Sequence, residues 1–127
     1  MNKWNFAAAA LMALTWGVHV FAGGPEIHGP IQGSDLPDYL RAISAVLWHA
    51  VSVILAVFAL AYLWLSRIEN KALSIVLAAT QLGFAGLFLW YGATLLGTIW
   101  PIPQWIIFLL IPAVSAAGTL RKQVSPA

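Results

Sequence analysis

The sequence contains no cysteine among its 127 residues, and charged side chains make up only 8% of it. Without cysteine the chain cannot form a disulfide bond, a thiolate metal site or a thiol nucleophile. The low charge content excludes a soluble domain with a polar surface, because 61% of the residues are hydrophobic. A net charge of +2, from scattered basic residues, is too small for nucleic-acid binding. We therefore expect an integral membrane protein with no nucleic-acid partner.

Acidic side chains are also missing from every long apolar run of the sequence. Membrane-embedded carboxylates usually mark the proton relays of transporters, so a carboxylate-coupled transporter is disfavoured. The sequence contains no HExxH metal motif and no ExxH pair of the kind found on bundle helices. A nucleophile motif and a phosphate-binding loop are absent as well. These absences favour a non-catalytic protein over an enzyme.

Four apolar segments approach or exceed the roughly 20 helical residues that cross a bilayer. They cover about residues 4–22, 40–66, 72–97 and 103–120. Trp16 and His19 are unusual near the end of a cleaved signal, so we expect the first segment to stay in the mature protein. The sequence thus predicts a single all-α domain over residues 1–127. It is a polytopic four-helix transmembrane bundle with one long outer loop between the first two helices.

The basic residues indicate the orientation of these spans. Lysine and arginine in short loops are retained on the cytoplasmic side of a membrane. Only Arg41 falls on one side of the predicted bundle. The other five basic residues share the opposite side: Lys3, Arg67, Lys71, Arg121 and Lys122. We expect a bacterial-type inner-membrane protein with both termini in the cytoplasm.

Glycine and proline recur between the first two apolar segments, in the stretch GGPEIHGPIQGSDLP over residues 23–37. This composition predicts an extended, turn-rich loop in which a long regular helix is not expected. We expect Ser34 or Asp35 to cap a short helical turn that leads into the second span, with Asp38 in its first turn. A connection of about 17 residues is long, and long loops often serve as lids or binding loops. The loop is expected to fold over the outer mouth of the bundle.

All three histidines map to this outer face. His19 lies near the outer end of the first span, His49 lies inside the outer start of the second, and His28 and Glu26 occupy the loop between them. Imidazole and carboxylate ligands without thiolate suit zinc, copper, iron or nickel. These four residues are therefore a candidate transition-metal site, and His19 with His49 is a candidate pair of axial ligands for haem. Their spacing matches no diagnostic motif.

An alternative is that the histidines are structural and hydrogen-bonded. Thr15 precedes His19 by four residues, and Ser52 follows His49 by three, so each ring has a hydroxyl on its own helix face. A neutral, partly buried imidazole needs one donor and one acceptor partner. Both interpretations place the same residues at the outer end of the bundle.

The third span adds polar and aromatic candidates. Trp90 and Tyr91 lie near its outer end, where they are expected to join the histidines in a pocket. Gln81 lies well inside the span, and an unpaired amide in hydrocarbon costs several kcal/mol, so it should face another helix or line a polar path. Pairs of small residues such as Ala79 and Gly83 indicate close helix packing.

Three functions remain open at this level. The first is an accessory membrane protein that docks a partner or a second copy, or binds a small hydrophobic ligand at its outer face. The second is a metal- or haem-binding membrane protein, and the third is a small transporter or channel. The candidate ligand-binding residues are His19, Glu26, His28, His49, Gln81, Trp90 and Tyr91.

Overall fold

The computed structural model describes residues 1–124, with the side chains of residues 1–118. Every regular element in this part of the chain is helical. The elements are α1 (Lys3–Val18), the π-helix η1 (His19–His28), α2 (Gly29–Gln32), α3 (Asp38–Leu65), α4 (Lys71–Leu95) and α5 (Trp105–Val124). The predicted all-α class is confirmed. Among the described residues, three continuous helical segments are long and apolar enough to cross a membrane, and a shorter apolar helix follows over Trp105–Gly118.

The first helical segment continues to Gln32, where the sequence predicted that it ends near residue 22. α1 passes directly into η1 and then into α2, so that only residues 33–37 connect it to α3. The prediction of an extended loop is therefore wrong over residues 23–32 and is right for the short connection over residues 33–37. The glycines of this stretch have no positive φ. A π-helix closes wider i→i+5 turns, which accommodate Pro25, a residue without an N–H.

The start of α3 also differs from its prediction. The Ser34 hydroxyl donates a hydrogen bond to the carbonyl of Ile31 at 2.6 Å, which closes the end of α2. The residue that precedes α3 is Pro37, and no side chain caps the helix. Residues 33–37 contain no helical turn, so the predicted turn capped by Ser34 or Asp35 is wrong, whereas the placement of Asp38 in the first turn of α3 is confirmed.

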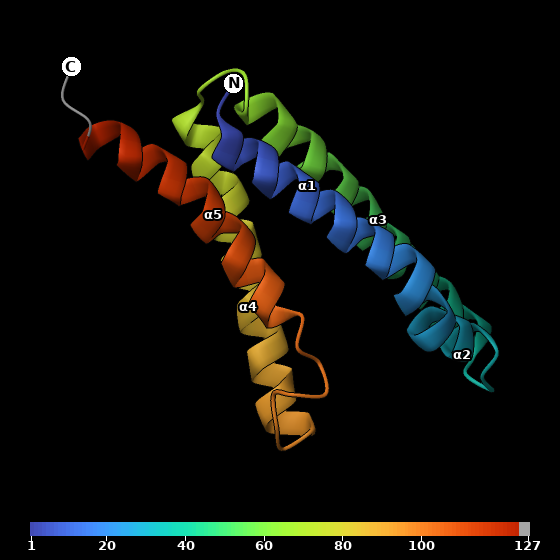
Figure 1. Ribbon diagram of the computed structural model, residues 1–127. Coiled ribbons are helices and arrows are strands. Elements are labelled where there is room, and N and C mark those ends of the chain that lie inside the picture. Colours follow the sequence, from blue (N-terminus) through green and yellow to red (C-terminus); the bar gives the residue numbers. More distant parts are fainter. Residues whose placement is uncertain (125–127) are drawn as a thin grey trace.

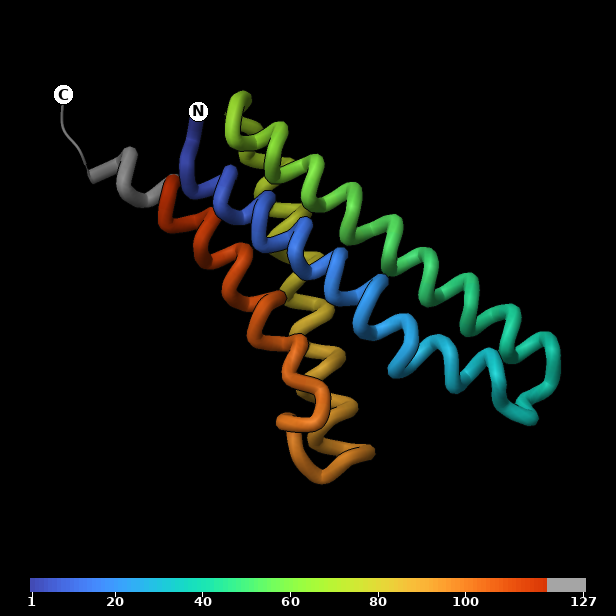
Figure 2. The backbone as a smooth tube through the Cα atoms, turned by 45° about the vertical axis from the view of Figure 1, so that its right-hand side comes forward, coloured from blue at the N-terminus to red at the C-terminus, as the bar shows by residue number. Residues whose placement is uncertain are grey.

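The long helices follow the spatial order α3, α1, α5, α4 (Figure 1). α1 packs against both α3 and α5, and α5 packs against α4, whereas α3 and α4 make little contact. The two pairs converge near the N-terminus and the α3–α4 turn, and they diverge toward α2 and the α4–α5 loop (Figure 2). The bundle is therefore closed at one end and open at the other.

Hydrogen bonds between three helices hold the closed end. The side-chain amide of Asn5 on α1 donates to the Leu65 carbonyl at 3.0 Å, and Ser115 on α5 donates to Asn5 Oδ1 at 2.6 Å. The backbone N–H of Asn2 donates to the Ser66 carbonyl at 2.6 Å. We call Asn2, Asn5, Leu65, Ser66 and Ser115 the junction. Its backbone and side-chain groups pair with one another, so the chain itself satisfies them.

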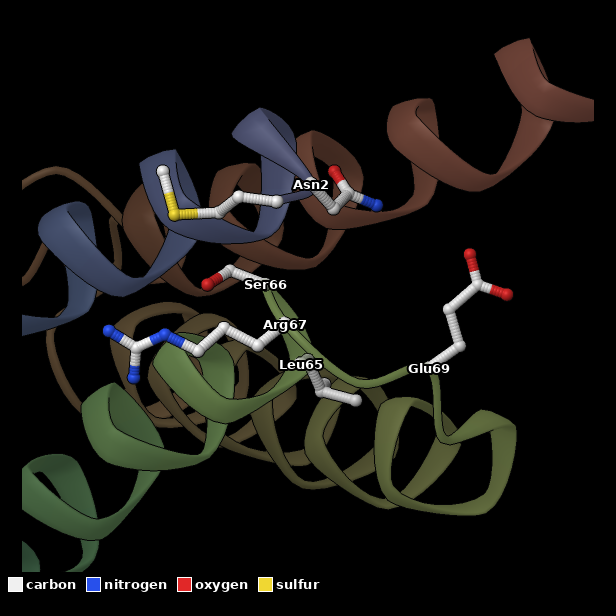
Figure 3. A pocket seen from close by; sticks show the side chains of 6 residues that line it. Asn2, Leu65, Ser66, Arg67 and Glu69 are labelled. Carbon is white, nitrogen blue, oxygen red and sulfur yellow. The ribbon is translucent and has the colours of Figure 1, made fainter.

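Helix α5 comes very close to α1 beside the junction. A Cβ atom placed on Gly118 would lie 2.7 Å from Cβ of Trp4, so only glycine fits there without a shift. A cavity of about 220 Å³ lies beside the junction, between the N-terminus and the α3–α4 turn. Arg67 and Glu69 line it and point to opposite sides (Figure 3). The charged groups of Arg67 and Glu69 therefore do not meet across the cavity.

One polar contact joins α3 to α4. Gln81 is fully buried, and its amide nitrogen donates to the Tyr62 hydroxyl at 2.6 Å and to the Leu77 carbonyl at 3.0 Å. The prediction that Gln81 faces another helix is confirmed. Its amide oxygen is buried and has no hydrogen-bond partner among the described residues.

The connection between α4 and α5 is longer than predicted. α4 ends at Leu95, and Gly97 follows with a φ of 68°, a left-handed conformation that ends a helix and suits glycine. Gly92 lets this connection fold back against α4, because a Cβ there would lie 3.1 Å from Cα of Ile99. α5 begins at Trp105 rather than at Pro103.

Candidate functional site

The π-helix determines which histidines share a face. His19 and His28 stand at its two ends, nine residues apart. In an α-helix nine residues make about 2.5 turns, which would place the two side chains on opposite faces. Because a π-helix turn takes in more residues, nine residues make about two turns, and the side chains lie on one face. η1 thereby presents both imidazoles to the neighbouring helix α3.

Both rings lie against the indole of Trp48 on α3. The His19 ring centroid is 4.1 Å from that of Trp48, with 19° between the ring planes, and the His28 centroid is 5.6 Å away, with 13°. Gly23 makes room for this indole, because a Cβ at Gly23 would lie 3.0 Å from Cη2 of Trp48. The glycine therefore serves close packing and not a turn. We call His19, His28, Trp48, His49 and Ser52 the histidine cluster.

Hydrogen bonds fix the orientation of His19 within the cluster. Its Nε2 lies 3.1 Å from the Ser52 hydroxyl and 3.4 Å from the Trp48 carbonyl. Ser52 donates its own proton to that same carbonyl at 3.1 Å, so its oxygen accepts from His19 Nε2–H. Thr15, the predicted partner of His19, donates to the Leu11 carbonyl instead. Ser52 therefore pairs with His19 across helices and not with His49 as predicted.

His28 and His49 form the other half of the cluster. Their ring centroids are 5.3 Å apart, in an edge-on arrangement with 71° between the planes. Nδ1 of His28 is buried and has no hydrogen-bond partner among the described residues. His49 is exposed, and so is Glu26. Within residues 1–118 no three histidine, aspartate or glutamate side chains are placed to hold a metal ion together. The predicted convergence of the histidines thus occurs, but Glu26 does not complete a ligand set with them.

The candidates on α4 lie apart from this cluster. Trp90 and Tyr91 are exposed, and α4 has no contact with η1 or α2 in the described part of the chain. Figure 1 shows why: α4 and α5 diverge from α1 and α3 toward that end. Gln81 is buried where α3 meets α4. The structure therefore does not bring Trp90, Tyr91 and Gln81 into one pocket with the histidines.

The outward face of α4 is a second candidate surface. Its exposed residues include five small side chains on one helical face, which the larger side chains of Ile75 and Trp90 share: Ala72, Ala79, Gly83, Gly86 and Ala93. A Cβ on Gly83 or Gly86 would meet no atom within 4 Å. We call these five residues the small-residue face. The pair Ala79 and Gly83, which the sequence predicted to pack within the bundle, lies on this outer surface.

Trp48 is the residue of the histidine cluster that sequence reasoning missed. Trp48 directly precedes His49. Its position in the sequence relative to His19 and His28 does not indicate that these two histidines stack on it. Comparisons with protein-family models, with curated proteins and with solved structures give no match to this chain. The histidine cluster and the small-residue face are therefore the features that bear on function.

Proposed function

We propose that this chain is a non-catalytic accessory protein of the bacterial inner membrane, which docks a transmembrane helix of a larger membrane protein. The observation that carries the proposal is the small-residue face of α4, which the chain itself leaves uncovered. Gly83 and Gly86 lie within a helix long and apolar enough to span a membrane. In helical membrane proteins such faces are typical of helix–helix contacts, because small side chains allow two backbones to approach closely.

The splayed arrangement supports the same proposal. α3 and α4 separate beyond the Gln81–Tyr62 contact, so neither helix covers the other along its open half. Leucine on leucine gains little in lipid, and association depends on packing and hydrogen bonds. A partner helix on α4 gains this packing at the glycines, where a lipid chain makes a less regular contact.

A matched pair of substitutions tests the docking face. Because the chain has no cysteine, Gly83→Cys and Val57→Cys each give one reactive site at an exposed position, on α4 and α3 respectively. We expect a reagent with a maleimide for the introduced thiol and a photoreactive group for any neighbouring residue to link the Gly83→Cys protein to one other membrane protein in native membranes. It should leave the Val57→Cys protein unlinked. A second copy of this chain as the only product, or equal linking from both positions, would contradict the proposal.

Gly83→Leu provides a second test of the same face. The added side chain fills the line of small residues and should abolish the cross-link from Gly86→Cys. Val57→Trp adds a much larger side chain at an exposed position elsewhere and should leave that cross-link intact. Helical circular dichroism of both variants checks that the fold is unchanged.

The proposed orientation places both termini in the cytoplasm. Lys3, Arg67 and Lys71 lie at the closed end of the bundle, and Arg41 lies at the opposite end. This bias follows the positive-inside rule. In intact cells a membrane-impermeant maleimide should label Glu26→Cys and should not label Lys3→Cys. The reverse labelling would overturn the orientation without affecting the docking face.

A further inference from the structure

His28 has a nitrogen that the contacts of the cluster do not explain. Its ring is stacked on Trp48, yet its Nδ1 is buried and unpartnered among the described residues. Buried polar atoms in native proteins nearly always have a partner, which can be a protein group, an ordered water, a ligand or an ion. The nearest imidazole is that of His49, which is exposed and which makes no other ring contact in the described part of the chain.

The separation of these two rings matches a shared tetrahedral ion. Zinc binds an imidazole nitrogen at about 2.0–2.1 Å, and the ring centroid lies about 1.1 Å further out. Two imidazoles on one tetrahedral ion therefore have centroids about 5 Å apart. The observed distance between His28 and His49 is 5.3 Å. A linear two-coordinate ion would need about 6 Å, again from the zinc bond length.

We propose that His28 and His49 bind one divalent transition-metal ion, with Zn²⁺ as the type case. His28 Nδ1 is one ligand atom, and the exposed His49 ring, 5.3 Å away between centroids, supplies the other nitrogen. Neutral imidazoles without thiolate suit Zn²⁺, Cu²⁺ and Ni²⁺. His19 is not one of this pair, because its ring stacks on Trp48 and the ring contact of His49 is with His28. This inference goes beyond the docking function and does not depend on it.

The site is open. No third histidine, aspartate or glutamate among the described residues is placed to join the pair, so water or a donor atom of another molecule occupies the other positions. The bound ion links η1 to α3 across 21 positions of sequence. Since the unfolded chain does not hold the two histidines together, ion binding stabilises the folded state.

Isothermal titration of the purified protein with Zn²⁺ tests this site. The protein must carry no histidine tag, because a tag would bind the ion itself. We expect saturable binding of about one ion per chain. Replacing either ligand should lower the affinity by about tenfold or more, since even changes around metal ligands cost about 10- to 100-fold. His28→Phe is the sharpest variant, because it keeps an aromatic ring against Trp48 and removes both nitrogens.

Two further variants complete the experiment. His49→Phe changes an exposed residue and provides the same test should His28→Phe not fold. His19→Phe should bind Zn²⁺ with the affinity of the unmodified protein. The proposal is overturned by the absence of saturable binding to the unmodified protein. Equal Zn²⁺ affinity in a folded His28→Phe or His49→Phe variant, as shown by circular dichroism, would overturn it as well.

Discussion

The two ends of this molecule treat their polar groups differently. At the junction, the Asn5 amide bonds to α3 and to α5, and the distances are those of ordinary hydrogen bonds. In the histidine cluster, His19 is bonded, but His28 Nδ1 has no partner among the described residues and His49 is exposed. One end satisfies its polar atoms internally, and the other leaves imidazole nitrogens available.

This difference separates a structural role from a binding role. Where every polar group is paired within the chain, substitution should mainly change the free energy of unfolding. Where a nitrogen is buried without a partner, substitution should mainly change what the protein binds. The same residue type would not reveal this from sequence, because His19 and His28 differ only in the groups that surround them.

The largest expected effect is at the junction. Asn5→Ala leaves the Leu65 carbonyl and the Ser115 hydroxyl without partners, at about 1–3 kcal/mol for each buried group. We expect the free energy of unfolding to fall by about 2–4 kcal/mol, measured by circular dichroism during denaturant titration in detergent micelles. Asn70→Ala, which removes only a local helix cap on α4, should cost about 1 kcal/mol. Equal losses for the two variants would show that the junction has no special role.

Substitutions at two adjacent glycines test how closely Trp48 packs against η1. Gly23→Ala places a Cβ about 3.0 Å from Cη2 of an indole on which two histidine rings stack, so the indole cannot move away freely. We expect a loss of about 1–2 kcal/mol in unfolding free energy and a change in near-ultraviolet circular dichroism. Gly24→Ala meets no atom within 4 Å and should be neutral or slightly stabilising. A Gly23→Ala variant with the unfolding free energy of the unmodified protein would contradict the close packing of η1 on α3.

The Gln81–Tyr62 contact should have an intermediate effect. Gln81→Leu removes the partner of a buried hydroxyl and should cost about 1 kcal/mol, the usual size of a hydrogen bond between membrane helices. Adding Tyr62→Phe removes the hydroxyl as well, and replacing both partners can be nearly neutral. The double variant should therefore be at least as stable as the single one in the same unfolding assay. A double variant that is less stable than Gln81→Leu would contradict this account of the contact.

The smallest expected effect on stability is at His49. It is exposed and its one ring contact is the edge of His28, so His49→Ala should change the unfolding free energy by less than about 0.5 kcal/mol without metal. A loss as large as that of Asn5→Ala would make His49 a structural residue.

Sequence alone predicted the helical class, the apolar segments and the approach of the three histidines, because hydrophobic length and loop position carry that information. It failed over residues 23–32, where glycine and proline usually indicate turns. There Gly23 makes space for Trp48, and the π-helix accommodates Pro25. The sequence also did not predict that Trp90 lies apart from the histidines. This separation depends on the divergence of α4 from α3, and no single residue indicates that divergence.

A thermal unfolding series with and without Zn²⁺ tests the contrast between the two ends most directly. The series compares the unmodified protein with Asn5→Ala and His49→Ala. The account predicts that Asn5→Ala lowers the melting temperature but keeps the rise caused by Zn²⁺, whereas His49→Ala keeps the melting temperature and loses that rise. A Zn²⁺ response that survives in His49→Ala, or that disappears in a folded Asn5→Ala variant, would contradict it.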